Sequence, residues 1–576
     1  MNTADYIIKN LEELGINEIF GVPGDYNFNI LDSIQNNENI KWIGCTNELN
    51  AGYASDGYAR IRGYGALVTT YGVGELSAIN AIAGSYAENI PVVHIVGLPS
   101  SKNIENKALI HHNTQDTDYK AFLKAYENIT AATAFITRDN AKLEIDRIFK
   151  ALVKERKPVY IALPSDIATM EISDRYTDFN WTSDRDALEK VVQKIADKIN
   201  DSNKPVIIAD SLIKRFDAKI EFKEFISKSQ IPVTNFIMGT NIVDFDNEQY
   251  LGGYAYEYGN LKAKNYIDES DCLISIGCIY SDLNSYGLHL PKKLNEQIAI
   301  YGTYTYVDGK LYNNVKMSEV LESLTEIIEP KNIKINKPIW EYEHKPVYNN
   351  PVTSEYIYPR IQEFIKENDI VIAETGTIPY AVSQIKFPHN VDIECQMLWG
   401  SIGWATPATM GACLAKPNSR VILLTGEGAH QMSAMEIGSI LRLGLKPVIL
   451  LINNNGYTTE RMISNDFNAE YHNIAGMNYS KFARAFDGDI WATRVETEDD
   501  FDKALKVTQI MNKMCYIEIA ADKTDSPEIT KQFLNAAKNK IEPAKITQPP
   551  KEVKSDFSLG TFSYETVVHQ GIKEEE

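Results

Sequence analysis

The chain contains 576 residues, enough for three or four domains of about 150 residues each. Hydrophobic residues make up 44% and charged residues 24%, a balance typical of globular proteins that excludes collagen-like, coiled-coil and disordered chains. The 58 Lys and Arg residues against 78 Asp and Glu residues give a net charge of −20. Such acidity disfavours nucleic acid and anionic membranes as partners, because both are negatively charged.

The cysteines and the N-terminal segment indicate a compartment. The six cysteines form no CxxC pair and no zinc-binding spacing with histidine, which favours a reducing environment. The segment Met1–Gly15 predicts an amphipathic helix with Ile7 and Leu11 on its apolar face, rather than a secretory signal. The longest apolar runs, such as Pro447–Ile452, are far shorter than the roughly 20 residues of a membrane-spanning helix. We expect a cytoplasmic protein without a membrane segment.

Residues 1–180 are predicted to form a first α/β domain. Short β-branched runs, Ala66–Thr70, Val92–Val96 and Val159–Leu163, alternate with helical stretches. This alternation is typical of a parallel sheet whose strands are joined by crossover helices. The polar stretch Pro164–Asp184 precedes the next apolar helix, so the boundary is expected near its end.

Residues 181–345 are predicted to form a central α/β domain. The runs Lys204–Asp210 and Cys272–Gly277 are predicted strands of its sheet. The stretch Pro330–Pro351 contains four prolines and many Lys and Asn residues, a composition typical of a linker. The central domain is therefore expected to end within this stretch.

Residues 346–540 are predicted to form a third α/β domain, with strands at Ile370–Ala373, Val421–Leu424 and Val448–Ile452. The last residues, 541–576, contain three prolines and end in Lys-Glu-Glu-Glu, and we expect a tail there. The chain is thus predicted to be an α/β protein with three domains of parallel sheet and flanking helices.

The first and third domains share a local pattern. Val68–Gly74 and Val421–Gly428 each predict a strand that turns through Gly-x-Gly into a helix, and a Pro-led strand follows each at nearly equal spacing. This pattern favours two related domains. The spacing alone leaves open a chance likeness between two strand–turn–helix units.

Neither Gly-x-Gly turn completes the fingerprint of a dinucleotide-binding site. The third glycine position is occupied by Ser77 in the first turn and by Gln431 in the second. A nicotinamide-dependent dehydrogenase is therefore disfavoured.

The second turn carries candidate metal ligands. Glu427 follows one predicted strand, and Asn454 and Gly456 follow the next, so a carboxylate, an amide oxygen and a backbone carbonyl are expected at one sheet edge. Oxygen ligands of this kind suit Mg²⁺ or Ca²⁺, with water and a diphosphate completing the coordination. Two ordinary turns remain the alternative interpretation.

Several motifs together resemble a known family. They are Gly21–Asn27, Asn47–Arg60, Gly72–Ala78, His111–His112 and Trp399–Gly403, together with the Gly-Glu-Gly and Asn-Asn elements. In this order they resemble the thiamin-diphosphate-dependent 2-oxo-acid decarboxylases, the pyruvate decarboxylase and indolepyruvate decarboxylase group. The resemblance extends from the N-terminus to roughly residue 540.

The resemblance implies an enzyme, a lyase that converts a 2-oxo acid to an aldehyde and CO₂ with thiamin diphosphate and Mg²⁺. It also implies that the first domain binds the pyrimidine of the cofactor and the third domain binds its diphosphate and metal. In this family the two domains come from different subunits. A homodimer or homotetramer with active sites at the subunit interface is therefore expected.

Individual roles follow from the same resemblance. Glu48 is expected to hydrogen-bond the aminopyrimidine ring and to promote loss of the proton at the thiazolium C2. Ile402 is expected to support the bent cofactor, and the Gly400 carbonyl to accept from its amino group. The family's proton-handling residues fall on Asp25, His111, His112 and Glu460. The remaining expected cofactor residues are Thr375, Thr377, Gly426, Gly428, Ala429 and Asn454, and the expected metal ligands are Glu427, Asn454 and Gly456.

The chain departs from the family at the metal motif and in the substrate pocket. Glu427 replaces the usual aspartate, and Ala429 lacks a common hydroxyl, so an altered metal preference or a non-catalytic relative are open alternatives. Thr375 resembles the pyruvate-preferring members, whereas Thr459 replaces an aliphatic residue. Pyruvate is the expected substrate. Branched-chain 2-oxo acids, phenylpyruvate, indolepyruvate and polar acids remain alternatives, and so does a carboligase, although the pair His111–His112 disfavours it.

Overall fold

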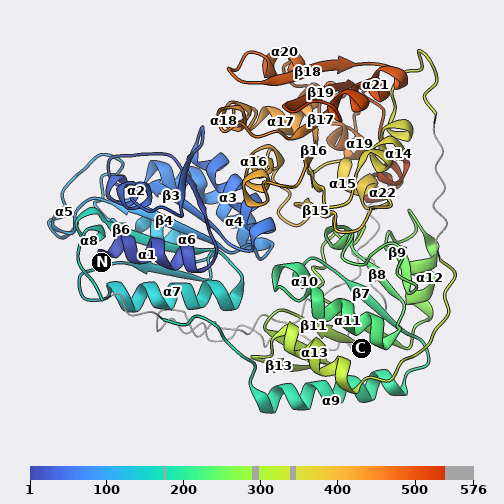
Figure 1. The fold of residues 1–576 in the computed structure, drawn as a ribbon, viewed down its shortest axis with the longest axis horizontal. Helices are drawn as coiled ribbons and strands as arrows, with labels where there is room; N and C mark the ends of the chain where they lie inside the picture. Colours follow the sequence, from blue (N-terminus) through green and yellow to red (C-terminus); the bar gives the residue numbers. More distant parts are fainter. Residues whose placement is uncertain (174–176, 288–296, 338–344, 539–576) are drawn as a thin grey trace, which may run out of the picture.

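The computed structural model describes residues 1–173, 177–287, 297–337 and 345–538. The described residues form three sheets, each flanked by helices (Figure 1). The N-terminal sheet lies beside the C-terminal sheet, and the central sheet lies below the C-terminal one in this view. The predicted tail, residues 541–576, lies outside the described residues.

The N-terminal sheet has the strand order β2-β1-β3-β4-β6-β5, with parallel pairing throughout. Its strands are β1 (Glu18–Gly21), β2 (Lys41–Gly44), β3 (Gly65–Thr70), β4 (Val92–Leu98), β5 (Ala132–Phe135) and β6 (Val159–Pro164). Its helices are α1 (Thr3–Glu13), α2 (Phe28–Gln35), α3 (Glu48–Arg62), α4 (Val73–Ala87), α5 (Ser101–Glu105), α6 (Ala121–Tyr126), α7 (Ala141–Glu155) and α8 (Ser165–Ala168). The three strands predicted here are confirmed as β3, β4 and β6, and the predicted N-terminal helix is α1.

The central sheet has the order β13-β12-β11-β10-β7-β8-β9. Its strands are β7 (Pro205–Ala209), β8 (Val233–Asn235), β9 (Tyr250–Gly253), β10 (Cys272–Ile276), β11 (Ile298–Ile300), β12 (Tyr304–Val307) and β13 (Lys310–Asn313). Its helical segments are α9 (Arg185–Asp201), α10 (Leu212–Arg215), α11 (Lys219–Ser229), η1 (Ile237–Gly239), α12 (Leu261–Glu269) and α13 (Met317–Ile327). The predicted strands are confirmed as β7 and β10.

One edge of the central sheet is antiparallel, which the prediction of parallel sheets did not include. Strand β12 pairs antiparallel with β11 and with β13. The turn between β12 and β13 is Asp308-Gly309, and both residues have positive φ. A two-residue turn of this kind is typical of a hairpin, and it is too short for the crossover that a parallel pair requires.

The C-terminal sheet has the order β15-β14-β16-β17-β19-β18 with parallel pairing throughout. Its strands are β14 (Ile370–Ala373), β15 (Asp392–Cys395), β16 (Val421–Gly426), β17 (Val448–Asn453), β18 (Ile490–Val495) and β19 (Met514–Ala520). Its helical segments are α14 (Ser354–Phe364), α15 (Ile378–Val382), α16 (Ala405–Ala415), α17 (Glu427–Gln431), α18 (Glu436–Arg442), α19 (Thr458–Ile463), η3 (Glu470–His472), α20 (Tyr479–Ala483), α21 (Glu498–Thr508) and α22 (Glu528–Lys538). When the strands of each sheet are numbered in chain order, the N-terminal and C-terminal sheets have the same order. This confirms the predicted relation between the first and third units.

Helices α3 and α16 join the two outer units. A Cβ added to Gly57 of α3 would lie 2.4 Å from the Cα atom of Ala408, and one added to Gly411 of α16 would lie 2.0 Å from the Ala54 carbonyl oxygen. The two helix backbones therefore approach too closely for any side chain at these glycines. The hydrophobic core accordingly runs from the N-terminal into the C-terminal unit.

Two further findings concern the thiols and the helices. All six cysteines are free thiols. Within the described ranges, no helix combines the length and the apolar character needed to cross a bilayer.

Candidate active site

The predicted residues of the third unit follow the carboxyl ends of neighbouring parallel strands. Thr375 comes after β14, Ile402 after β15, Glu427 after β16 and Asn454 after β17. The carboxyl ends of parallel strands meet at one edge of a sheet, where open α/β sheets bind ligands. A cavity of about 920 Å³ lies at this edge. Every site residue predicted in the third unit lines it, namely Thr375, Thr377, Gly400, Ile402, Gly426, Glu427, Gly428, Ala429, Asn454, Gly456 and Glu460.

The end of the cavity near α17 fits a hard divalent cation. Glu427 is buried, and its Oε1 accepts a hydrogen bond from the Gly456 backbone N–H at 2.6 Å. Burial raises the pKa of Glu427. The Oδ1 atom of Asn454 is buried without a hydrogen-bond partner among the described residues. A buried carboxylate and an unsatisfied amide oxygen are donors that a cation such as Mg²⁺ would satisfy.

Glycine determines the backbone conformation at the end of the cavity near α17. Gly456 has φ +138°, and a Cβ there would lie 2.4 Å from both the Arg461 guanidinium and the His472 carbonyl oxygen. Arg461 donates to the Asn454 carbonyl oxygen at 3.3 Å, so it holds the loop that carries the amide. Nothing lies within 4 Å of a Cβ added to Gly426, which leaves this position open. The turn after β16 therefore offers space and backbone groups to an anion beside the oxygen ligands.

The cavity is also lined by the loop between β15 and α16, which contains Trp399, Gly400 and Ile402. Trp399 donates from its indole nitrogen to Asn80 at 2.9 Å, and Tyr53 hydrogen-bonds the Ser401 hydroxyl at 2.5 Å. These two bonds attach the loop to α4 and α3 of the N-terminal unit. Gly400, between the two bonded residues, has φ +67°, a conformation that favours glycine. The wall that contains Gly400 and Ile402 is thus fixed by contacts across the chain.

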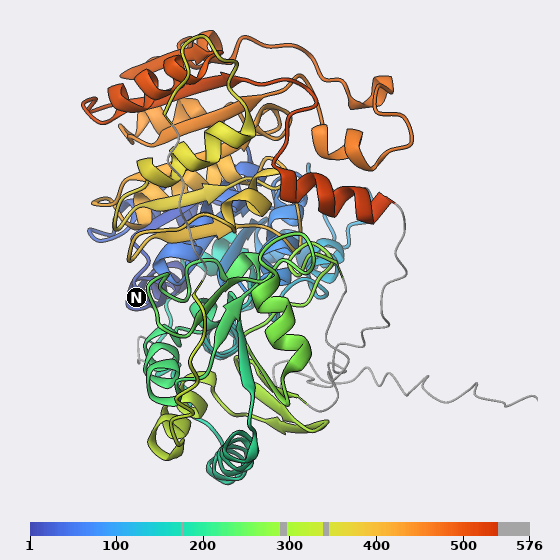
Figure 2. The same ribbon diagram turned by 90° about the vertical axis from the view of Figure 1, so that its right-hand side faces the viewer.

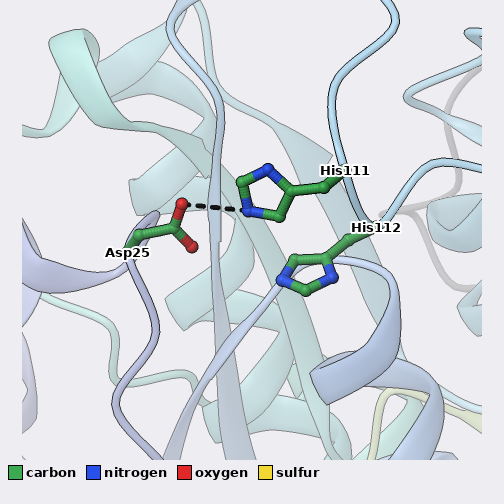
Figure 3. A group of neighbouring side chains, drawn as sticks. All are labelled: Asp25, His111 and His112. Atoms are coloured by element: carbon green, nitrogen blue, oxygen red, sulfur yellow. Dashed lines mark ion pairs between the residues drawn. The ribbon is translucent and has the colours of Figure 1, made fainter.

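Three of the predicted proton-handling residues form a cluster in the N-terminal unit (Figure 3). The Nε2 atom of His111 lies 3.1 Å from Asp25 Oδ2, and the rings of His111 and His112 are 4.5 Å apart between centroids. The Tyr26 hydroxyl hydrogen-bonds the other ring nitrogen of His111 at 3.3 Å. The Asp25 and His111 side chains are 47% and 57% exposed, so the cluster is accessible from outside this chain.

Glu48 starts α3 at the same edge of the N-terminal sheet. It is partly buried, and its Oε1 would lie 3.2 Å from a Cβ added to Gly74 at the start of α4. The N-terminal site residues follow β1, β2 and β4, and these strands correspond to β14, β15 and β17 of the related C-terminal sheet. The two groups therefore lie at equivalent edges of their own sheets.

The structure separates the predicted catalytic set into two groups. Glu460 lines the cavity, whereas Asp25, Glu48, His111 and His112 do not. A single chain thus brings together the predicted cofactor and metal residues of the third unit, and it leaves the N-terminal group outside the cavity.

Several residues of the cavity were not predicted from the sequence. Tyr258, Asp282 and Leu283 of the central unit line it, as do Phe533 and Leu534 of α22. The rings of Phe533 and Tyr380 are 5.1 Å apart. Nothing in the local sequence indicates these contacts, because each depends on how the central unit and the last helix pack against the third sheet. Figure 2 shows α22 beside the central unit.

Comparison with protein families identifies thiamin diphosphate, also called thiamine pyrophosphate, as the cofactor. Residues 1–122 match the thiamine pyrophosphate enzyme N-terminal TPP binding domain, residues 192–310 match the central domain, and residues 375–519 match the C-terminal TPP binding domain. The three matches follow the order of the three sheets.

Curated relatives are similar along nearly their whole length. The chain is 35% identical to pyruvate decarboxylase isozyme 2 of Saccharomyces cerevisiae over 554 residues, covering 93% of this chain and 98% of the relative. It is 34% identical to pyruvate decarboxylase of Kluyveromyces lactis over 555 residues, covering 93% and 98%. It is 35% identical to the alpha-keto-acid decarboxylase of Mycolicibacterium paratuberculosis over 540 residues, covering 91% and 95%. With its three matching domains, its paired related sheets and its cavity at the strand ends, the chain belongs to the family of thiamin-diphosphate-dependent 2-oxo-acid decarboxylases.

Proposed function

We propose that this enzyme decarboxylates pyruvate without oxidation, releasing acetaldehyde and CO₂, with thiamin diphosphate and Mg²⁺ as cofactors. The observation that carries the proposal is the cavity of about 920 Å³, in which Thr375, Glu427, Asn454 and Glu460 lie together. The names of two of the relatives above support pyruvate as the substrate.

Glu427, Asn454 and Gly456 are the proposed ligands of Mg²⁺. The unsatisfied Oδ1 of Asn454 supports this assignment, because a buried amide oxygen without a partner is costly unless a donor or a cation reaches it. Gly426, Gly428 and Ala429 would bind the diphosphate from the turn after β16, and Thr377 would do so from the start of α15. The Gly456 backbone N–H donates to the carboxylate of Glu427, a contact that would hold this longer side chain in place for the metal.

The pyrimidine side of the site is proposed to use Glu48, Gly400 and Ile402. Thiamin diphosphate, when bound, supplies a thiazolium ring that takes up the electrons left behind as CO₂ departs. Glu48 would hold a proton at the aminopyrimidine ring nitrogen, and the Gly400 carbonyl would accept from the amino group. Ile402 would support the cofactor from the loop between β15 and α16.

Asp25, His111, His112 and Glu460 are proposed to handle protons. The carbon that loses CO₂ must gain a proton before the aldehyde leaves. The 3.1 Å contact between His111 Nε2 and Asp25 Oδ2 supports a relay, because a carboxylate beside an imidazole orients the ring. Glu460 would act from the cavity wall.

We further propose a homodimer or homotetramer in which the N-terminal unit of one subunit faces the cavity of another. The separation of the two residue groups within one chain supports this arrangement. Large apolar side chains are exposed next to both groups, as expected of a covered surface. These side chains are Phe28, Val73, Leu76 and Leu109 in the N-terminal unit and Leu398, Trp399, Met432 and Met435 in the third unit. The free thiols support a cytoplasmic location.

The test is aldehyde formation from a panel of 2-oxo acids: pyruvate, 2-oxoisovalerate, phenylpyruvate and indolepyruvate. Thiamin diphosphate and Mg²⁺ are each withheld in turn. We expect pyruvate to give the highest kcat/KM and no aldehyde when either cofactor is removed. A higher kcat/KM for a bulkier acid would replace pyruvate as the substrate, and condensation products without aldehyde would identify a carboligase.

A further inference from the structure

Glu374 is a buried carboxyl group that bonds two segments lining the cavity, Thr375 after β14 and the end of the loop between β15 and α16. It follows β14 directly, precedes Thr375 and is 0% exposed. Its Oε1 accepts from the Thr375 backbone N–H at 3.1 Å. Its Oε2 accepts from the backbone N–H groups of Gly403 at 3.3 Å and Ala405 at 3.2 Å.

These hydrogen bonds connect segments that are about thirty residues apart in sequence. Gly403 and Ala405 stand on either side of Trp404, which is the N-cap residue of α16. The Glu374 carboxyl group therefore satisfies donors at the start of α16 that the helix itself cannot pair. It thereby fixes the end of the loop that contains Gly400 and Ile402.

Gln396 connects the other end of this loop to Thr375. The Thr375 hydroxyl donates to the Gln396 carbonyl oxygen at 2.8 Å, and the Ser401 backbone N–H donates to Gln396 Oε1 at 2.8 Å. A Cβ added to Gly400 would lie 3.9 Å from the methyl carbon of Thr375. Glu374 and Gln396 thus attach the Gly400 loop to Thr375 at both ends.

We propose that Glu374 is a positioning residue of the cofactor site, which holds Gly400 and Ile402 at the distance from Thr375 that the pyrimidine of thiamin diphosphate requires. The inference rests on the proposed roles of Gly400 and Ile402. Glu374 itself does not line the cavity, so it acts through the backbone groups that it binds.

The cost of burying this carboxyl group supports a specific role. Burial raises the pKa of Glu374 to about 8, against the three backbone N–H groups, which lower it. A carboxyl group without a positively charged partner is costly in an apolar interior, and no ion pair to it occurs within the residues that the structure describes. An apolar residue would fill the space without that cost but would leave three donors unpaired.

The test substitutes Glu374→Gln, which keeps the size of the side chain. An amide has only one acceptor oxygen. Its NH₂ group would face a backbone N–H donor in place of the second carboxylate oxygen, so the bridge between Thr375 and the loop before α16 would break. The matched control is Asp369→Asn at the opposite end of β14. Asp369 is also a buried carboxyl group, and it accepts from the Lys366 backbone N–H at 2.7 Å and from Arg420, away from the cavity.

Binding of thiamin diphosphate and of inorganic diphosphate, both with Mg²⁺, is measured by calorimetry on each variant. Inorganic diphosphate probes the metal and diphosphate end alone. We expect Glu374→Gln to weaken thiamin diphosphate at least tenfold and inorganic diphosphate less than twofold. Asp369→Asn should leave the ratio of the two affinities unchanged, although it lowers the melting temperature.

Equal losses for both ligands, or a thiamin diphosphate affinity within twofold of the parent, would overturn the proposal. If Glu374→Gln does not fold, Glu374→Asp provides the same comparison, because its shorter carboxylate cannot span both walls. The readout does not depend on turnover. A failure of pyruvate decarboxylation therefore leaves this test intact, and a failure here leaves the reaction assay intact.

Discussion

Among the proposed metal ligands, Asn454 has the clearest physical signature. Its amide oxygen is buried and unpaired in the described part of the chain, whereas Glu427 already accepts a backbone hydrogen bond. The sequence motif predicted Glu427, Asn454 and Gly456 as ligands without distinguishing among them. The difference between them depends on the path of the 454–456 loop, which Arg461 holds from the following helix.

Glu48→Gln tests the proposed proton-holding role at the first turn of α3. The amide keeps the shape of the side chain but cannot exchange a proton with the aminopyrimidine. We expect turnover to fall about 10²–10⁴-fold, the usual contribution of a general acid–base group. Thiamin diphosphate affinity, measured by calorimetry, should stay within a few-fold of the parent. Near-normal turnover would contradict the role.

The buried histidine His94 is expected to make the fold sensitive to acid. Burial lowers the pKa of His94 to about 3, and its ring packs against Tyr126 and Tyr160. The native state keeps this ring neutral, whereas the unfolded chain binds a proton below the ordinary pKa of about 6.5. The stability contribution is therefore complete above about pH 6.5 and is lost as the pH falls from there toward about 3.

His94→Phe removes this titration. Between pH 7.5 and pH 5.5 the parent should lose about 1 kcal/mol through His94, at about 1.4 kcal/mol per pH unit below 6.5. We expect the fall in melting temperature between the two pH values to be about 1 °C smaller in His94→Phe. Thr69→Val, which removes the 2.9 Å hydrogen-bond partner but keeps the histidine, should retain the parental fall. An unchanged fall in His94→Phe would disprove the assignment.

Helix α22 is the element that contributes most to the cavity without any sequence signal for it. The ring of Phe533 lies 5.1 Å from Tyr380 and 5.7 Å from Tyr286, between centroids. An aromatic cluster thus joins the last described helix, the third unit and the central unit over the cavity. Under the proposed function, these bulky rings are expected to limit the size of the substrate.

Phe533→Ala tests whether this cluster limits substrate size. The truncation opens space next to Tyr380, so we expect the kcat/KM ratio of phenylpyruvate to pyruvate to rise about tenfold or more. The ratio cancels any general loss of stability. Ile529→Ala, on the same helix but outside the cavity lining, should leave the ratio unchanged. A ratio that moves equally in both variants would point to a general effect of the helix.

At the scale of the whole molecule, buried charges connect the three sheets. Arg60 of α3 pairs with Asp56 at 2.6 Å and with Glu88 at 2.7 Å, and it lies 3.6 Å from Glu394 of β15. Glu394 in turn pairs with Arg215 of the central unit at 2.5 Å. Burial of such a network is costly unless every charge is paired, so the three units are expected to hold one relative arrangement.

Mixed subunits test the proposed shared active site. Glu48→Gln and Glu427→Gln are each expected to be inactive alone. If Glu48 of one chain serves the cavity of another, each mixed dimer contains one intact site, and equal co-expression should restore about one quarter of parental activity. Co-expression of Glu48→Gln with Asp25→Asn should restore nothing, because both changes lie in the N-terminal unit. No recovery in the first mixture would place the whole site in one chain.

The sequence by itself determined the family, the related outer sheets and which residues follow the strand ends. These features depend on local strand–turn–helix patterns, in which a residue after a buried parallel strand must lie at the carboxyl edge of its sheet. Only the tertiary structure decided the bridge made by Glu374 and the cover formed by α22. Each of these depends on contacts between segments far apart in the chain, and no local pattern specifies such contacts.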